Sequence, residues 1–227
     1  MRSIDDLIAD IRREAASAEF PVDLSIYEKA EKDPLAPVLF AGSLTAPVCV
    51  FGRDLGRDEV ALGQPLVGAG GKLVRRGLIR AFGKTASTRD DMFLESALEF
   101  ALLTNTVPYK PPGNKAYPGR VKERFRPFVA ELIASFWTGD RVICLGTEAF
   151  QWFAPYAESG AAEAFWARDD RYEADLPCTL TAEHGGGTIR KRILLAPLPH
   201  PSPLNQRWYK RFPEMLDSRL RAAVTGA

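Results

Sequence analysis

Residues 48–56 read VCVFGRDLG, an apolar run that ends in glycine and continues into a polar turn. Residues 48–52 are too few for a stable helix and contain no alternating polar residue, so we predict a short strand that is buried on both faces. Similar apolar runs occur at 101–105, 141–146 and 193–197. Strands without a solvent-facing side are typical of a parallel sheet that helices cover on both faces.

Helical patterns separate these runs, so that strand and helix alternate along the chain. We predict helices at about 3–18, 70–82, 90–99, 120–137, 146–153 and 207–224 from their apolar spacing. The first helix begins with Ser3 as its N-cap and has Asp6 at the capping-box position. This alternation predicts an α/β fold of three layers, α/β/α, around a central, mainly parallel sheet of four strands.

Two segments fit this alternation less simply. Residues 33–47 are rich in proline, which predicts extended or turn backbone. Residues 178–193 contain Gly185, Gly186 and Gly187 near their middle, a pattern that fits a hairpin ahead of the fourth strand. His184 lies beside these glycines, and we interpret it as a surface residue of that hairpin.

Composition indicates one globular domain over residues 1–227. Apolar residues make up 46% of the chain and charged residues 26%, which excludes disorder or coiled coil as its main structure. The formal net charge of +1 neither demands nor excludes a nucleic-acid partner. No window approaches ~18 uninterrupted apolar residues, and the charged N-terminal pattern indicates an amphipathic helix, so we expect neither a membrane partner nor a secretory signal.

The three cysteines, Cys49, Cys144 and Cys178, lie far apart and form no C-x-x-C pair. This spacing fits neither a disulfide framework nor a zinc ribbon. Reduced thiols in a cytoplasmic protein are the simplest interpretation, and we expect no metal and no cofactor. The sequence leaves the oligomeric state open, with a monomer as the simplest expectation.

Three predicted strands end at side chains that can do chemistry. Asp54 lies in the turn after the first strand, Asn105 closes the second, and His200 lies just past the fourth. Parallel strands end at the same edge of a sheet, and α/β proteins bind their ligands beyond that edge. We therefore predict an active site that combines a carboxylate, an amide and an imidazole.

The same segments resemble the motifs of uracil-DNA glycosylases, and most of all those of the thermophile-type (family 4-like) branch. Residues 52–56 and 63–68 read GRDLG and GQPLVG, similar in sequence and spacing to G-E-x-P-G followed by G-R-P-F-V-G. Residues 104–114 resemble the T-N-x-V-x-x-x-P-P-G-N block, and residues 200–204 read HPSPL, a motif of several branches. With residues 142–146, which are similar to the third strand of the superfamily, the resemblance extends over about residues 40–215.

The chain departs from this branch at several positions. The branch binds a four-iron cluster through four cysteines, whereas this chain has three cysteines elsewhere and Tyr109 at one of the expected positions. The chain therefore resembles a cluster-less branch, and packing must hold the loop at 106–127. Asp54 matches the carboxylate of the branch with the motif G-Q-D-P-Y. Gly56 replaces the tyrosine that crowds the thymine methyl group there, and Leu66 replaces an aromatic residue that stacks on uracil, which leaves strict substrate selection open.

The resemblance implies a monofunctional DNA glycosylase that flips uracil out of single- or double-stranded DNA and hydrolyses its glycosidic bond, leaving an abasic site. Asp54 would stabilise positive charge on the sugar and orient the attacking water, and His200 would donate a hydrogen bond to uracil O2. Asn105 would accept from uracil N3–H and donate to O4, a pattern that cytosine reverses. Without the resemblance, each of these residues fits a structural role. Asp54 fits a turn cap, His200 fits a buried ring that nearby groups satisfy, and Asn105 fits a strand-end residue that bonds the backbone.

Further residues have predicted roles in binding the base or the DNA. Uracil contacts are predicted for Asn105, Leu66, Gly52, Arg53 and Leu55. DNA contacts are predicted for Leu204, Ser202, Pro201, Pro203, Gly68, Lys72 and Arg207. Leu204 is a candidate wedge that enters the base stack. Core packing is the alternative for Leu66 and Leu204, and a turn cap is the alternative for Ser202.

Two basic clusters fit a local DNA footprint on a nearly neutral protein. The first comprises Lys72, Arg75, Arg76, Arg80 and Lys84, and the second comprises Arg207, Lys210 and Arg211, with Trp208 and Tyr209 between them. Solvated faces of two helices explain both clusters equally well.

Two other functions stay open. The same fold could bind uracil-containing or abasic DNA with little turnover, because Leu55, Gly56 and Leu66 depart from the usual motifs. Alternatively, the GAGG sequence at 68–71 could cradle the phosphate of a free nucleotide in an unrelated α/β enzyme. That sequence is neither G-x-G-x-x-G nor a Walker loop, so it is a weak signal.

Overall fold

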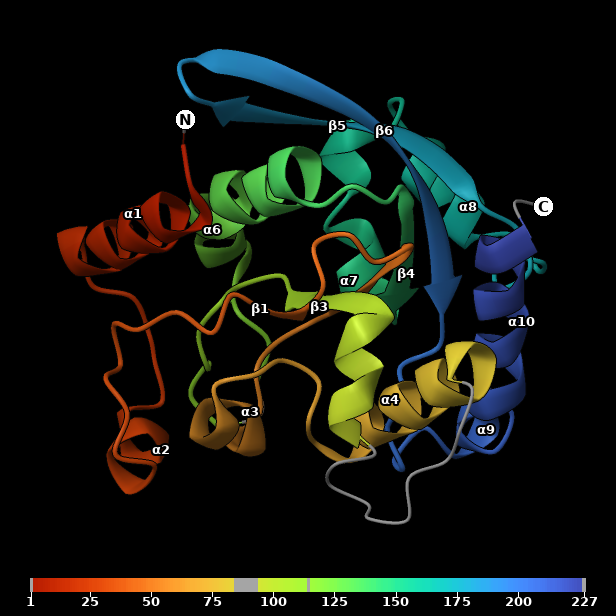
Figure 1. Ribbon diagram of the computed structural model, residues 1–227, viewed down its shortest axis with the longest axis horizontal. Helices are drawn as coiled ribbons and strands as arrows, with labels where there is room; N and C mark the ends of the chain where they lie inside the picture. Colours follow the sequence, from red (N-terminus) through yellow and green to blue (C-terminus); the bar gives the residue numbers. More distant parts are fainter. Residues whose placement is uncertain (1, 84–93, 114, 226–227) are drawn as a thin grey trace.

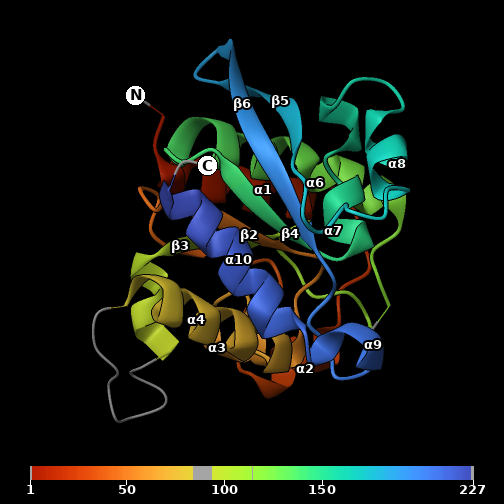
Figure 2. The same ribbon diagram turned by 90° about the vertical axis from the view of Figure 1, so that its right-hand side faces the viewer.

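The computed structural model describes residues 2–83, 94–113 and 115–225. Within these ranges a six-stranded sheet has the order β1-β3-β2-β4-β6-β5. Its strands are β1 (Phe40–Gly42), β2 (Val48–Gly52), β3 (Ala101–Asn105), β4 (Arg141–Leu145), β5 (Leu176–His184) and β6 (Gly187–Leu198). The four central strands are parallel, and β1 and β5 pair antiparallel at the two edges. The sheet lies between two layers of helices (Figures 1 and 2).

One face of the sheet is covered by α1 (Ile4–Ser17), α6 (Gly119–Glu131), η2 (Leu132–Phe136), α7 (Thr147–Gln151), η3 (Ala154–Tyr156) and α8 (Ala161–Trp166). The other face is covered by α4 (Ala69–Phe82), η1 (Ser96–Glu99) and α10 (Phe212–Thr225). Figure 2 shows α10 lying along α4 on that second face. The short helices α2 (Leu24–Lys29), α3 (Arg57–Leu62) and α9 (Gln206–Tyr209) lie toward the end of the molecule to which the parallel strands point (Figure 1).

Both faces of the central strands are buried, as the unbroken apolar runs predict. Every residue of β2 is buried. Cys49 and Phe51 pack into the core under α6 and α7, whereas Val48 and Val50 pack into the core under α4 and α10. This period of two gives each parallel strand two apolar faces, which is why its sequence shows no polar alternation. The prediction of an α/β fold is confirmed.

The predicted number of strands was too small. The four apolar runs form β2, β3, β4 and β6, but two edge strands accompany them. The segment predicted as extended or turn at 33–47 contains β1, whose three residues are too few to show a period. The hairpin predicted at 178–193 is present as β5 and β6, and β5 alternates buried and exposed residues because one of its faces meets solvent.

Several helix boundaries also differ from the predictions. The helix predicted at 120–137 ends at Glu131 and continues as the π-turn η2. The helix predicted at 207–224 is broken into α9 and α10. Of the segment 90–99, residues 90–93 lie outside the described residues, and residues 96–99 form the 3-10 turn η1. The capping box of α1 is present, with reciprocal bonds between Ser3 and Asp6.

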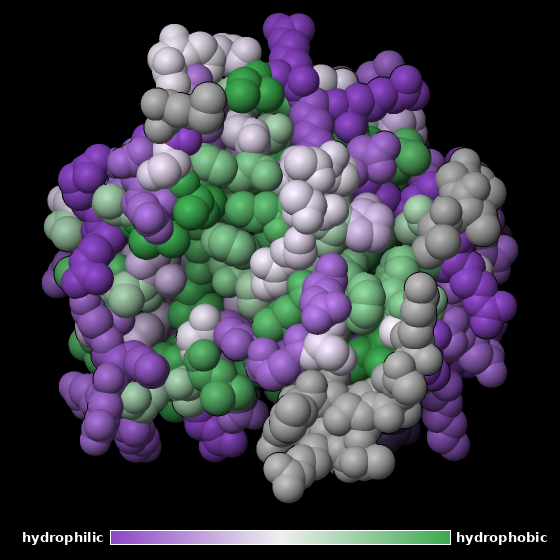
Figure 3. All heavy atoms as spheres, in the orientation of Figure 1, coloured by the Kyte–Doolittle hydropathy of each residue, from purple (hydrophilic) through white to green (hydrophobic). Residues whose placement is uncertain are grey.

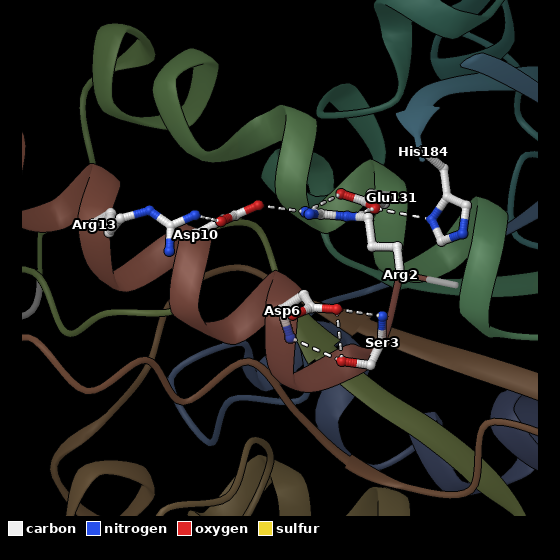
Figure 4. A network of polar contacts seen from close by, with 7 residues as sticks. All are labelled: Arg2, Ser3, Asp6, Asp10, Arg13, Glu131 and His184. Atoms are coloured by element: carbon white, nitrogen blue, oxygen red, sulfur yellow. Dashed lines mark hydrogen bonds and ion pairs between the residues drawn. The ribbon is translucent and has the colours of Figure 1, made fainter. Parts of the chain in front are cut away.

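His184 is not the simple surface residue that the sequence predicts. It ends β5, but its side chain is only 19% exposed and its Nδ1 lies 2.9 Å from a carboxylate oxygen of Glu131. The same carboxylate pairs with Arg2, whose guanidinium also lies 2.7 Å from Asp10 (Figure 4). This network ties the hairpin and α6 to the start of the chain.

The surface gives two further observations. Among the described residues, no helix combines the length and the apolar character that crossing a bilayer requires. In the face seen in Figure 3, hydrophilic residues gather at the margins and hydrophobic ones nearer the middle.

Candidate active site

The site lies where the chain changes direction across the sheet. β2 is followed by β3 on one side, and β4 then pairs with the opposite side of β2. In open α/β sheets, a crevice for ligands forms at such a switch point. A cleft of about 560 Å³ is found there. It is lined by Gly52, Arg53, Asp54, Leu55, Gly56, Glu59, Leu66, Gly68, Ala69, Gly70, Gly71, Asn105, Pro111, Gly113, Lys115, Leu145, His200, Pro201, Ser202, Pro203 and Leu204.

Asp54 is a buried carboxylate on the wall of this cleft. Its side chain is 4% exposed, and Arg53 Nε lies 2.7 Å from Oδ2 but is not aligned for a hydrogen bond. The groups that interact with this carboxylate are the Arg53 guanidinium, the more distant charge of Lys122 and the backbone amide of Tyr117, which belongs to a different segment, so the carboxylate does not cap its own turn. Burial raises the pKa of Asp54, although the charges of Arg53 and Lys122 act in the opposite direction. The wall of the cleft therefore holds a buried acid that is costly to ionise.

Asn105 closes β3 directly beside the end of β2, because it is the register partner of Gly52. Its side chain is buried, and Oδ1 has no hydrogen-bond partner among the described residues. A Cβ at Gly52 would overlap this Oδ1 atom, so the close approach requires glycine. The next residue, Thr106, donates its amide to the carbonyl oxygens of Gly52 and Arg53 at 3.2 and 3.1 Å. The two strand ends are thus bonded together, and Asn105 lines the cleft with a buried amide oxygen that no described residue satisfies.

His200 enters the cleft from the loop after β6. Gly146, at the end of β4, adopts φ 89° and allows the close approach of His200, since a Cβ there would lie 3.1 Å from the His200 Cβ. The ring is accessible from the cleft and accepts no hydrogen bond from a described residue, so it is not the buried, satisfied ring of the alternative interpretation. The surrounding protein still desolvates the ring, and this effect and the charge of Arg53 lower the pKa of His200. The neutral imidazole is therefore favoured.

Leu66 is held in an unusual backbone conformation at the cleft. It has φ 57°, a left-handed value that is costly for a residue with a side chain. Arg75, which is 2% exposed, donates to the carbonyl oxygens of Leu66 and Pro65 at 2.9 and 3.2 Å and to Gln64 Oε1 at 3.0 Å. A Cβ at Gly71 would overlap the Leu66 carbonyl group. Leu66 borders both the core and the cleft, so both sequence interpretations describe part of its surroundings.

Sequence reasoning missed Glu59, a buried residue that organises the same loop. One of its carboxylate oxygens accepts the backbone amides of Val67 at 3.2 Å and Gly68 at 3.0 Å. A Cβ at Gly56 would overlap the other oxygen, so this glycine makes room for the carboxylate. In the sequence, the available signal was the position of Glu59 between the two glycine-containing motifs at 52–56 and 63–68. Its hydrogen-bond partners become evident only in the folded structure.

The loop after His200 forms one rim of the cleft. Leu204 is 93% exposed, which excludes the core-packing alternative. Ser202 Oγ accepts the Leu204 amide at 3.3 Å, so the hydroxyl does cap the turn. The Pro201 carbonyl oxygen would lie 2.7 Å from a Cβ at Gly70, and the rim therefore packs closely on the first turn of α4.

The structure brings together all of the predicted site residues except Lys72 and Arg207. Lys72 is exposed on α4, facing a different hollow, and Arg207 lies on α9 beyond the rim. The prediction that the first basic cluster forms one DNA-binding surface is wrong. Arg75 is buried in its bonds to the Leu66 loop, and Arg80 pairs with Asp217 at 3.0 Å. Lys84 lies outside the described residues, as does Asn114 of the second motif.

The residues do not fit an iron–sulfur cluster. Cys49, Cys144 and Cys178 are buried and free, and burial raises their pKa values, which disfavours the thiolate form that ligates iron. Tyr109 instead fills the loop after β3, with its ring 5.1 Å from that of Phe20 and its hydroxyl donating to a carbonyl oxygen. Ring packing thus holds the part of the loop around Tyr109, and buried polar bonds of Lys110 to Tyr27 and Pro111 hold the residues that follow.

The family model of the uracil DNA glycosylase superfamily matches residues 40–223, a range that includes every residue lining the cleft. No curated protein matches the chain.

Proposed function

The chain belongs to the uracil DNA glycosylase superfamily, and we propose on that basis that it is a monofunctional DNA glycosylase that hydrolyses the glycosidic bond of an everted deoxyuridine. The products are free uracil and an abasic site in DNA. The observation that carries the proposal is the convergence of a buried carboxylate, a buried amide oxygen and an imidazole on one cleft at the switch point of the sheet.

Asp54 and His200 meet the two charges that develop as the bond breaks. The sugar becomes cationic, and the ionised carboxylate of Asp54 stabilises it and orients the attacking water. Because the carboxylate is only 4% exposed, its field is weakly screened, which strengthens this stabilisation. Uracil leaves as an anion, and a neutral His200 donates a hydrogen bond to O2. The lowered pKa of His200 supports this role as an electrophile.

Asn105 selects the base. Its buried, unpartnered Oδ1 accepts from uracil N3–H, and its amide nitrogen donates to O4. Cytosine presents an acceptor at N3 and a donor at C4, so its binding would leave buried polar groups unpaired at a cost of ~1–3 kcal/mol each. Leu66 contributes the apolar contact to the base, with Gly52, Arg53 and Leu55 beside it.

The DNA follows the rim of the cleft. We propose that Leu204, which is 93% exposed at the tip of a proline-rich loop, enters the base stack and keeps the nucleotide everted. Pro201, Ser202, Pro203 and Gly68 contact the strand nearby, and Lys72 and Arg207 add charge farther out. We further propose a cluster-less relative of the thermophile-type branch that works in the cytoplasm, since its three cysteines are free.

Uracil release from a labelled oligonucleotide tests the proposal. The wild-type protein should generate alkali-labile sites with multiple turnovers, and Asp54→Asn should lower turnover at least ~100-fold while still binding the uracil-containing strand. Glu163→Ala, an exposed change on α8, is the matched control and should act as wild type. A stoichiometric complex without strand cleavage would favour a binding protein, and preferential binding of free nucleotides would favour an unrelated enzyme.

A further inference from the structure

A patch of alternating arginine and aromatic side chains lies beyond the rim of the cleft. It joins two segments that are distant in sequence, the turn after α8 and the helix α9. Figure 2 shows α8 and α9 on the same side of the molecule. We call this patch the arginine–aromatic strip, and it consists of Trp166, Arg171, Tyr172, Arg207, Trp208 and Arg211.

Ring contacts connect the two halves of the strip. The Trp166 and Tyr172 rings lie 6.1 Å apart between centroids, and the Tyr172 and Trp208 rings lie 5.2 Å apart, both edge to face. The Arg171 guanidinium lies 4.8 Å from the centre of Tyr172. Since such aromatic pairs are directional, the rings fix the positions of the side chains that rest on them.

The arginines of the strip are positioned without being neutralised. Arg207 and Arg211 lie 4.9 and 5.3 Å from the centre of the Trp208 ring, and neither pairs with a carboxylate among the described residues. Arg171 likewise has no carboxylate partner there, but its Nη1 donates to the Arg168 carbonyl oxygen at 2.6 Å and its Nε is buried, which leaves Nη2 as the part of its guanidinium that can meet an anion. Arg168 on the same turn is paired with Asp170. A guanidinium that rests on a ring uses its flat face and keeps N–H edges for an anion such as phosphate.

A buried arginine holds the turn that carries Arg171. Arg219 of α10 is 5% exposed and donates to the carbonyl oxygens of Glu173 at 3.1 Å and Ala174 at 2.6 Å. It also pairs with Asp175 at 2.9 Å. Because the turn is held by buried, charge-assisted bonds, the strip is pre-organised and loses little entropy on binding.

The strip is continuous with the rim of the cleft. Asn205 directly follows Leu204, donates its amide to the Ser202 carbonyl at 2.8 Å and accepts the Trp208 amide at 3.0 Å. Asn205 Nδ2 also lies 3.3 Å from the His200 carbonyl oxygen. One bonded unit therefore carries the imidazole of the cleft, the exposed Leu204 and the ring on which two arginines rest.

We infer that the arginine–aromatic strip binds phosphates of the DNA strand that contains the everted nucleotide, on one side of that nucleotide only. This inference rests on the proposed function. It adds that only one flank of the everted nucleotide contacts the strip, because the strip extends from the Leu204 side of the cleft alone. Strands that continue over the strip bind more tightly than strands that end at the rim.

Single-stranded oligonucleotides with one deoxyuridine and flanks of different length test the inference. The variant is Arg171→Ala/Arg211→Ala, and binding is measured by fluorescence anisotropy over a range of salt concentrations. Each single-strand phosphate contact contributes ~0.7 to the slope of log affinity against log salt, so the loss of two contacts should reduce the slope by about 1.4. The variant's affinity for the longer strand should be at least ~10-fold lower than that of wild type. Lengthening one flank of the oligonucleotide should no longer increase its affinity. Uracil release from a trinucleotide should stay unchanged.

The matched control is Arg190→Ala/Arg192→Ala on the β5–β6 hairpin. These arginines are exposed and lack a carboxylate partner among the described residues, and both lie on β6. The turn between β5 and β6 lies at the opposite end of the molecule from α9 (Figure 1). The control should keep the wild-type salt slope. The inference is wrong if the strip variant keeps the wild-type salt slope and still binds strands with the longer flank more tightly. It is also wrong if the only change in the strip variant is a loss of self-association, measured by sedimentation. Failure of the proposed function gives a different result, namely salt-dependent binding at the strip without uracil release by wild type.

Discussion

Replacing Glu59 by alanine should loosen the wall of the cleft that carries Leu66. The change removes one carboxylate oxygen that accepts two backbone amides, those of Val67 at 3.2 Å and Gly68 at 3.0 Å. Hydrogen bonds to a charged group contribute ~1.5–3 kcal/mol each. Val67 is 8% exposed, so its amide would lose its partner without gaining much water, whereas Gly68 is half-buried and can be hydrated. We therefore expect a loss of about 2–4 kcal/mol in the free energy of unfolding.

The same change should impair function, because Leu66 and Gly68 both line the cleft. A displacement of about 1 Å near a reacting centre can cost ~100-fold in rate. Glu59→Gln retains an oxygen acceptor and should lose only about 1 kcal/mol, with activity between those of wild type and Glu59→Ala. Urea unfolding with an unchanged m-value measures stability, and single-turnover uracil release measures activity.

Glu163→Ala on α8 is the control, since this residue is exposed and lies outside the cleft. The reasoning is refuted if Glu59→Ala unfolds within ~0.5 kcal/mol of wild type, the range of ordinary surface substitutions. Equal stability of the alanine and glutamine variants would also contradict it, because only the glutamine can accept the two amides.

Four further predictions concern groups inside the cleft. Burial raises the pKa of Asp54, so kcat/KM should begin to fall on acidification at a higher pH than for an ordinary aspartate, and a profile that is flat down to about pH 4 would contradict the assignment. The stability that this carboxyl contributes is present when it is protonated and is lost as pH rises through its raised pKa. Asp54→Asn should therefore increase the free energy of unfolding at neutral pH, and an unchanged or lower Tm in thermal melts would contradict this. Asn105→Asp should relax discrimination against cytosine, measured as the ratio of kcat/KM on the two bases, and an unaltered ratio would exclude base reading by this residue. Gly52→Ala places a methyl group against Asn105 Oδ1 and should lower kcat/KM at least ~10-fold, whereas wild-type kinetics would show that the amide position is unimportant.

The central sheet could be predicted because its residues carry a local signal. Each parallel strand is buried on both faces, so β2, β3 and β4 read as short apolar runs whatever the rest of the chain does. The edge strand β1 gave no such signal, because its three residues obtain their hydrogen bonds from β3, some 60 residues away along the chain. Its existence depends on the pairing and not on its own composition.

The candidate site divides in the same way. Asp54, Asn105 and His200 could be placed together from sequence, because the ends of parallel strands meet at one edge. Glu59 and Arg75 could not be placed, since a buried carboxylate and a buried guanidinium look like surface charges until their partners are known. Sequence was even misleading for Arg75, which appeared among the basic residues of a DNA footprint but is 2% exposed.

Local apolar pattern and chain order thus sufficed for the parallel core and for the three groups at its edge, because burial and strand direction are properties of single segments. The tertiary structure decided which charges are buried, how Leu66 is held at φ 57°, and which arginines stand unpaired on aromatic rings. Those features depend on hydrogen bonds and ring contacts between segments that only folding brings together. The sequence of one segment does not show which other segment it will contact.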